Sequence, residues 1–108
     1  MPIPQLSPQQ LKAALDAGET LVVLDVREAF EVSLAPFPGA VHIPMGQIVD
    51  RMDQELDPDA RIVVLCHHGV RSWHVAMLLH ARDFSQVENL SGGIDRWSLE
   101  IDPGLRRY

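Results

Sequence analysis

The stretch RIVVLCHHGVRSWHVAMLLHARDF, residues 61–84, joins two segments of different character through a short polar loop. After Arg61, residues 62–66 are all apolar and three of the five are β-branched, a pattern typical of a strand that is covered on both faces of a parallel sheet. Residues 71–84 have the pattern of a helix that is apolar on most sides. Its inward face is expected to consist of Val75, Leu78 and Leu79. Together these segments predict one strand–loop–helix unit of an α/β fold.

The rest of the chain alternates between strand-like and helix-like segments in the same way. Further strands are expected at residues 20–26, 39–44 and 86–90. Further helices are expected at residues 6–19, 45–56 and 94–100. Alternation at this spacing predicts one α/β domain over residues 1–108, with a central parallel sheet and helices on both faces.

Local signals mark the first of these helices most clearly. Ser7 is the expected N-cap, Pro8 occupies the first helical position, and Gln10 is placed to complete a capping box. Gly18 is expected to end the helix. The expected inward faces are Leu11, Ala14 and Leu15 in this helix, and Ile48, Met52 and Leu56 in the helix at 45–56.

Composition narrows the classes of function. The chain has 108 residues, 46% of them hydrophobic and 22% charged, which is ordinary for a soluble globular protein. Its net charge of −6, with Lys12 as the only lysine, argues against nucleic-acid or membrane partners. Neither a long apolar run nor a signal peptide is visible, so we expect a cytoplasmic protein, a monomer by default, without a cofactor.

Polar residues follow two of the expected strands at the point where each strand ends. Asp25 lies near the end of the run at 20–26 and Arg27 directly follows it, and Cys66 ends the run at 61–66. In open parallel sheets, functional sites form at the carboxyl ends of the strands. We therefore expect these side chains to share one edge of the sheet.

The loop after Cys66, the only cysteine, has the features of an anion cradle. Gly69 permits a positive φ, so the backbone can curl with its N–H groups pointing inward. The following helix adds its positive N-terminal end, and Arg71 adds a full charge. A thiol with a pKa near 8.5 is only about 3% ionised at pH 7, and such a loop would raise that fraction strongly. Cys66 is therefore a candidate nucleophile.

Two other interpretations of Cys66 compete with this one. A cysteine after an apolar strand is often a small buried residue, although such a residue does not need the glycine and arginine that follow. A metal site would combine Cys66 with His67, His68 and either His42 or His74. Neighbouring histidines do not easily converge on one ion, and no second cysteine is present, so no metal is expected. His67 and His68 are expected at the mouth of the pocket. The remaining histidines, His42, His74 and His80, are expected in packing or surface positions.

Several motifs, taken in order, resemble the rhodanese-like domains, specifically the small single-domain bacterial type. They are LDVRE, PGAVHIP, CHHGVRS and LSGGIDRWSLEIDPGLRRY, which together span nearly the whole chain. The resemblance implies a sulfurtransferase of the thiosulfate sulfurtransferase (rhodanese) kind. Such an enzyme takes a sulfane sulfur from a small donor such as thiosulfate, holds it as a persulfide, and passes it to cyanide, a thiol or a protein thiol.

The resemblance also implies roles for individual residues. Cys66 corresponds to the persulfide-forming nucleophile, and Asp25 and Arg27 correspond to a supporting pair that braces the loop and contributes charge. A purely structural ion pair is the alternative for those two residues. The loop that binds the persulfide corresponds to His67, His68, Gly69, Val70, Arg71 and Ser72.

Other readings of the same pattern remain open. Phosphatases and arsenate reductases with a similar loop place five residues between cysteine and arginine, whereas four lie between Cys66 and Arg71 here. The shorter ring fits a single sulfur atom better than a tetrahedral oxyanion. A non-catalytic sulfur carrier or regulatory module is the second alternative.

Two further stretches complete the expectations. Gly92 and Gly93 are expected to form a tight turn, and Trp97 a wall of the core or of the pocket. At residues 35–37 the chain has Ala-Pro-Phe, where many members of the family have Gly-His-Ile. We expect this change to have little effect on sulfur transfer.

Overall fold

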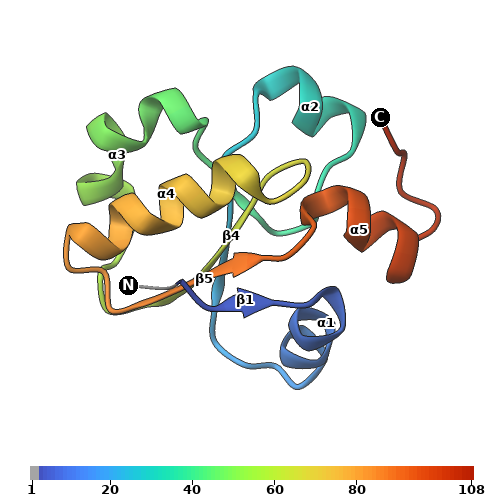
Figure 1. The fold of residues 1–108 in the computed structure, drawn as a ribbon, viewed down its shortest axis with the longest axis horizontal. Helices are drawn as coiled ribbons and strands as arrows, with labels where there is room; N and C mark the ends of the chain where they lie inside the picture. The colour runs from blue at the N-terminus through green and yellow to red at the C-terminus, as the bar shows by residue number, and fades with distance from the viewer. Residues whose placement is uncertain (1–2) are drawn as a thin grey trace.

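Five parallel strands form one sheet with helices packed against both of its faces (Figure 1). The structure is a computed structural model, and it describes residues 3–108. Residues 1 and 2, which the expected domain includes, lie outside the described part. The strands are β1 (Gln5–Leu6), β2 (Val22–Asp25), β3 (Val41–His42), β4 (Arg61–Leu65) and β5 (Gln86–Leu90). The helices are α1 (Pro8–Asp16), α2 (Ala29–Leu34), α3 (Ile48–Glu55), α4 (Val70–Ala81) and α5 (Gly93–Glu100), with a 3₁₀ turn η1 (Met45–Gln47) before α3.

The order of the strands places β2 and β4 side by side within the sheet. The order is β1-β5-β4-β2-β3, and each neighbouring pair is parallel. After β4 the chain continues to β5 on one side, whereas after β2 it continues to β3 on the other. The carboxyl ends of β2 and β4 therefore flank a switch point of the topology, which is where open α/β sheets bind their ligands.

Each face of the sheet has its own apolar core, as the buried-strand pattern predicts. The alternation of side chains along β4 sends Val64 toward one face and Val63 toward the other. The first core also contains Ile48, Met52 and Leu56 from α3 and its end, and Val75, Ala76 and Leu79 from α4. The second core also contains Leu11 from α1, and Ile94 and Trp97 from α5.

Most of the expected helix signals are confirmed. Ser7 caps α1: its Oγ accepts the N–H of Gln10, whose side chain in turn accepts the N–H of Ser7. The expectation for Leu15 is wrong, because the buried positions of α1 are spaced three apart, which leaves Leu15 38% exposed. In α4, Leu78 is only partly buried, and Ala76 takes the fully buried position.

Two elements are not predicted from the sequence. The strand β1 is two residues long, too short for a periodicity to be visible, and it is formed by pairing with β5. The helix α2 has six residues. Among residues 3–108, no helix combines the length and the apolar character needed to cross a membrane.

Candidate active site

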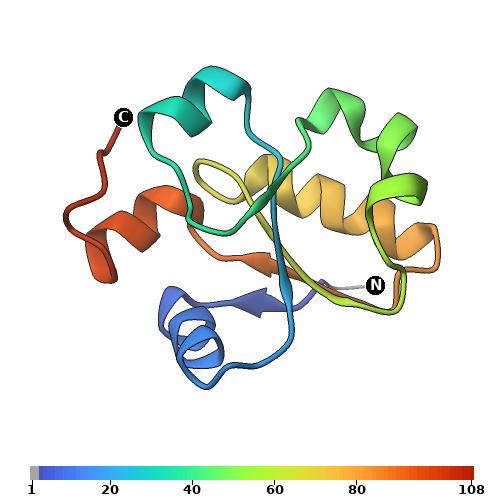
Figure 2. The same ribbon diagram turned by 180° about the vertical axis from the view of Figure 1, so that it is seen from behind.

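Cys66 and Asp25 lie at the same edge of the sheet, as the strand ends predict. Asp25, the last residue of β2, is in register with Leu65, the last residue of β4. The N–H of Val26 donates to the carbonyl of Leu65 at 3.0 Å, so the segments that follow β2 and β4 leave the sheet side by side. The loop that follows Cys66 then turns directly into α4 (Figure 2).

The loop wraps its backbone around the sulfur of Cys66. Gly69 has a φ of +99° and caps α4, as its expected positive φ requires. The N–H groups of Gly69 and Ser72 both donate to Cys66 Sγ, at 3.1 Å and 3.4 Å. Cys66 is only 1% exposed, as the buried-residue interpretation expects. Two converging N–H groups at the start of a 12-residue helix nevertheless form an environment that favours a negative charge on sulfur.

A short chain of hydrogen bonds fixes this loop from β5. The Cys66 thiol donates to Ser72 Oγ at 3.3 Å, and Ser72 donates to Asn89 Oδ1 at 2.5 Å. The amide nitrogen of Asn89 donates to the carbonyl of Gly69 at 3.0 Å and to Gln5 Oε1 at 3.1 Å. Asn89, which is 2% exposed, thus connects both sides of the loop to the strand beneath it.

The guanidinium of Arg71, which was expected to add a full positive charge at the loop, is bound by the carboxylate of Glu31. Arg71 Nη1 and Nη2 lie 2.7 Å and 2.8 Å from the two oxygens of Glu31, a bidentate pair. The phenol of Tyr108 also donates to Glu31 Oε2, at 2.9 Å. Hydrogen bonds from Arg71 lower the pKa of Glu31 to about 2, and burial raises the pKa of Tyr108 to about 12. Glu31 is therefore a buried carboxylate that remains ionised.

The low pKa of Glu31 predicts an acid-sensitive contribution to stability. Because the folded-state pKa of about 2 lies below the ordinary 4.5, the contribution is complete above pH 4.5 and is lost as the pH falls toward 2. Its full size is about 3 kcal/mol, of which about 2 kcal/mol is lost by pH 3. Urea unfolding gives the free energy of unfolding at pH 7 and at pH 3. The decrease between these two pH values should be about 2 kcal/mol smaller in Glu31→Gln than in the wild-type protein. An equal loss in both proteins would contradict the assignment.

Asp25 and Arg27 form a buried ion pair at the end of β2. This is the geometry expected of a structural pair, and the supporting role in sulfur transfer stays a prediction. Their exposures are 1% and 0%, and Arg27 Nη2 lies 2.7 Å from Asp25 Oδ2. The same guanidinium donates to the carbonyl of Ala35 at 2.8 Å and to the Tyr108 hydroxyl at 3.0 Å. Burial by itself would lower the pKa of Arg27, but hydrogen bonds with Asp25 and Tyr108 raise it. The pair therefore holds α2 and Tyr108 in place and carries no net charge.

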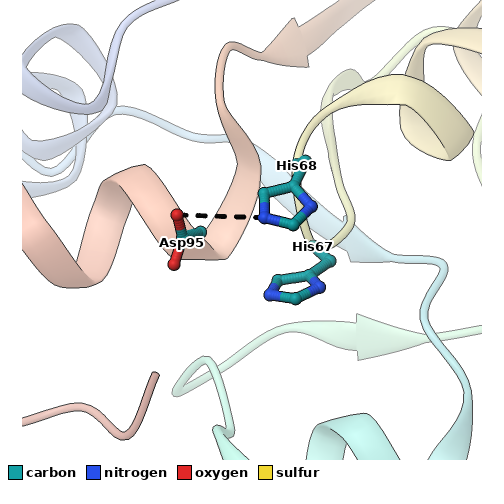
Figure 3. A group of neighbouring side chains, drawn as sticks. All are labelled: His67, His68 and Asp95. Carbon is teal, nitrogen blue, oxygen red and sulfur yellow. Dashed lines mark ion pairs between the residues drawn. The ribbon is translucent and has the colours of Figure 1, made fainter. Parts of the chain in front are cut away.

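His67 and His68 stack on one another beside Asp95 of α5 (Figure 3). The centres of their rings are 3.8 Å apart, and His67 also stacks on Tyr108 at 3.9 Å. The ligand atoms of His67, His68 and Asp95 lie within 4.8 Å of one another, so this group could hold a metal ion. The two histidines do come together here, contrary to the sequence argument. Asp95 is already paired with Arg107, at 3.0 Å, so a metal would have to compete with that cation.

The start of α5 closes tightly on the backbone of the cysteine loop. The N–H groups of Ile94 and Asp95 donate to the carbonyls of Cys66 and His67, at 2.8 Å and 3.1 Å. Gly93 lies between them with a φ of +61°, and a Cβ at this position would come within 2.5 Å of both carbonyl oxygens. The expected tight turn at Gly92 and Gly93 therefore also supports the backbone of the loop that follows Cys66.

Replacing Gly93 by alanine should both destabilise the protein and disturb the loop. A methyl group here must displace the carbonyls of Cys66 and His67 and must also adopt a left-handed conformation, so we expect a cost of about 3 kcal/mol or more. Gly18→Ala is the matched control, because Gly18 has a φ of +71° and nothing within 4 Å of a Cβ. It should cost only about 1 kcal/mol. Urea unfolding of the two variants checks the difference, and equal costs would refute the close contact.

The remaining residues singled out in the sequence occupy supporting or outer positions. Val70 is exposed, whereas Trp97 belongs to the second core and lies against Phe37, with ring centres 4.9 Å apart. Pro36, in the Ala-Pro-Phe stretch at residues 35–37, is exposed. The Nε2 atom of His42 lies 2.7 Å from the carbonyl oxygen of Arg27.

Three residues of the site are missed by sequence reasoning: Glu31, Asn89 and Tyr108. Each contacts the loop or its supports from another element, and Glu31 is 40 residues from Arg71. No local motif marks any of them. The PGLRRY ending within the family-like motif is the nearest signal, since it contains Tyr108.

Comparison with known proteins agrees with this geometry. A family model described as "Rhodanese-like domain" matches residues 7–100. The chain is 40% identical over 103 residues to YtwF of Bacillus subtilis, provisionally named a sulfurtransferase, covering 95% of this chain and 98% of that protein. It is 38% identical over 96 residues to YrkF of the same organism, provisionally named a sulfur carrier protein, covering 89% of this chain and 51% of that one.

Solved structures give the same result for the fold. A rhodanese-like domain protein from Staphylococcus aureus superposes with a TM-score of 0.84 at 27% identity, covering 98% of this chain and 99% of that chain.

Several other relatives are longer proteins. One is the tRNA uridine(34) hydroxylase of Bradyrhizobium diazoefficiens, which is 37% identical over 100 residues, covering 88% of this chain and 39% of that protein. With a matching family model over most of its length and full-length relatives, the chain belongs to the rhodanese-like domain family.

Proposed function

We propose that this protein transfers sulfane sulfur through a persulfide on Cys66. The observation that carries the proposal is the pair of N–H groups, from Gly69 and Ser72, that converge on Cys66 Sγ. Family membership and relatives named for sulfur transfer or sulfur carriage support the same chemistry.

The first half of the reaction loads the sulfur. The Cys66 thiolate attacks the outer sulfur of the donor, and a new S–S bond forms while the donor's own S–S bond breaks. The leaving group departs with the electron pair; for thiosulfate it is sulfite. The outer sulfur of the persulfide then carries the negative charge. N–H groups of the loop and the N-terminal end of α4 would stabilise that charge.

The second half passes the sulfur on. A thiolate or cyanide attacks the outer sulfur of the persulfide, and Cys66 leaves as a thiolate, ready for another cycle. The loop's preference for an anionic sulfur favours this departure as well. Both steps use the same charge at the same place, so one fixed loop can serve them without rearrangement.

Turnover with thiosulfate and cyanide tests this function. Thiocyanate should form in many equivalents per protein. A single equivalent would instead indicate a sulfur carrier, the alternative that the relative YrkF supports. Hydrolysis of an aryl phosphate that depends on Cys66 would overturn the proposal in favour of a phosphatase. The four-residue spacing between Cys66 and Arg71 argues against that outcome.

A further inference from the structure

The guanidinium groups around the cysteine loop are each paired with a carboxylate. Three such pairs surround the loop: Arg71 with Glu31, Arg27 with Asp25, and Arg107 with Asp95, joined at 2.7 Å, 2.7 Å and 3.0 Å. A guanidinium that is bound to a carboxylate offers an incoming anion little net attraction. These three arginines therefore do not make the site a strong cationic pocket.

The histidines do not replace the missing positive charge. His67 is stacked between His68 and Tyr108, and burial lowers its pKa below the ordinary 6.5. This burial disfavours a positive charge on the ring. Nε2 of His68 lies 3.9 Å from a carboxylate oxygen of Asp95, so an anionic group lies directly beside this ring. The groups that donate hydrogen bonds to the sulfur itself are the backbone N–H groups of Gly69 and Ser72.

Glu31 is the residue that keeps Arg71 neutralised. Its side chain is 6% exposed, and besides Arg71 it accepts hydrogen bonds from the N–H of Glu28 at 3.1 Å and from the phenol of Tyr108. These donors come from two sides and hold the carboxylate facing Arg71. Arg71 is more accessible, with a side chain that is 35% exposed, so it could meet an incoming donor if Glu31 did not bind it.

We propose that Glu31 determines donor specificity: by neutralising Arg71, it makes the Cys66 loop favour singly charged hydropersulfides over the thiosulfate dianion. This inference rests on the persulfide chemistry proposed above. Attack on a hydropersulfide anion, R–S–S⁻, breaks its S–S bond and releases R–S⁻, while Cys66 keeps the outer sulfur as a persulfide. The corresponding attack on thiosulfate brings one more negative charge to the thiolate. Without a free cation, that additional charge slows the approach.

Glu31→Gln tests the proposal, because glutamine keeps the shape of glutamate and removes its charge. Loading of Cys66 is followed by intact mass in single-turnover experiments, once with thiosulfate and once with the hydropersulfide of 2-mercaptoethanol. Loading from thiosulfate should become about tenfold faster, and loading from the hydropersulfide should change by a smaller factor. The deciding quantity is the ratio of the loading rate with thiosulfate to that with the hydropersulfide, compared between Glu31→Gln and the wild-type protein. The ratio is compared because the two donors differ in intrinsic reactivity.

Two controls separate this effect from net charge and show whether it depends on Arg71. Glu55→Gln removes a carboxylate from the exposed pair with Arg51 on α3, so it changes the net charge equally and should leave the ratio unchanged. The double variant Glu31→Gln with Arg71→Gln should not show the faster loading from thiosulfate that is expected of Glu31→Gln alone. In the unaltered protein, thiosulfate loading should respond only weakly to added salt, because the guanidinium is already paired.

The outcomes distinguish this inference from the proposed function. If neither donor adds sulfur to Cys66, the persulfide chemistry itself fails. If both donors load Cys66 but Glu31→Gln leaves the ratio unchanged, the function stands and the role of Glu31 is overturned. A steep fall of wild-type thiosulfate loading with salt would overturn it too, since that would indicate an unpaired cation at the site.

Discussion

Cys66→Ser should abolish sulfur transfer while leaving the protein folded. A serine hydroxyl is not ionised near neutral pH, so it cannot attack a sulfane sulfur at a useful rate. The smaller oxygen can still accept the N–H groups of Gly69 and Ser72, so we expect a stability cost of only about 1 kcal/mol. Thiocyanate formation from thiosulfate and cyanide, together with urea unfolding, measures both effects.

Ser72→Ala is the informative comparison for that variant. It removes the hydroxyl between Cys66 and Asn89 but keeps the N–H that donates to the sulfur. Loading should therefore be slowed and not lost. Transfer that persists in Cys66→Ser would mean that sulfur is carried elsewhere, and the mechanism would have to be abandoned.

Arg27→Met should be among the most destabilising single substitutions in this chain. It leaves Asp25, which is 1% exposed, without its cation, and it removes donors to Ala35 and Tyr108. Breaking a buried ion pair in this way costs about 3–5 kcal/mol, a large part of the total stability of a small domain. Urea unfolding at pH 7 measures the change, because the midpoint and the slope together give the free energy of unfolding.

Two companion variants show whether the burial of the ion pair causes the loss of stability in Arg27→Met. Arg51→Met breaks an exposed pair with Glu55 and should cost less than about 1 kcal/mol. Asp25→Asn combined with Arg27→Met should recover part of the loss, because no buried charge is then left unpaired. A similar small cost for Arg27→Met and Arg51→Met would show that the buried pair is not a structural support.

Features encoded within a few neighbouring residues were predictable from the sequence. The apolar run before Cys66 and the alternating segments predicted the parallel sheet, and Ser7 with Gln10 predicted the start of α1. The glycine at position 69 predicted the left-handed turn after the cysteine. In each case the physical determinant is local: side-chain periodicity, a capping hydrogen bond, or the absence of a Cβ.

Features that depend on partners far along the chain were not predictable. The bond between Arg71 and Glu31 joins α4 to α2 across 40 residues, and Tyr108 reaches Arg27 across 81. Nothing near Arg71 in the sequence reveals that its charge is matched by a buried carboxylate. The sequence predicted the positive charge of Arg71 beside the cysteine loop, but not the carboxylate that pairs with it. Local pattern identified the nucleophile, whereas the charge balance around it required the fold.

The most direct test of the central claim is the intact mass of the protein after exposure to a sulfane donor. Wild-type protein treated with the hydropersulfide of 2-mercaptoethanol and then freed of donor should gain the mass of one sulfur atom. Peptide mapping should locate that atom on Cys66, and addition of cyanide should remove it with release of thiocyanate. No gain in mass, or a gain that persists in Cys66→Ser, would contradict the account.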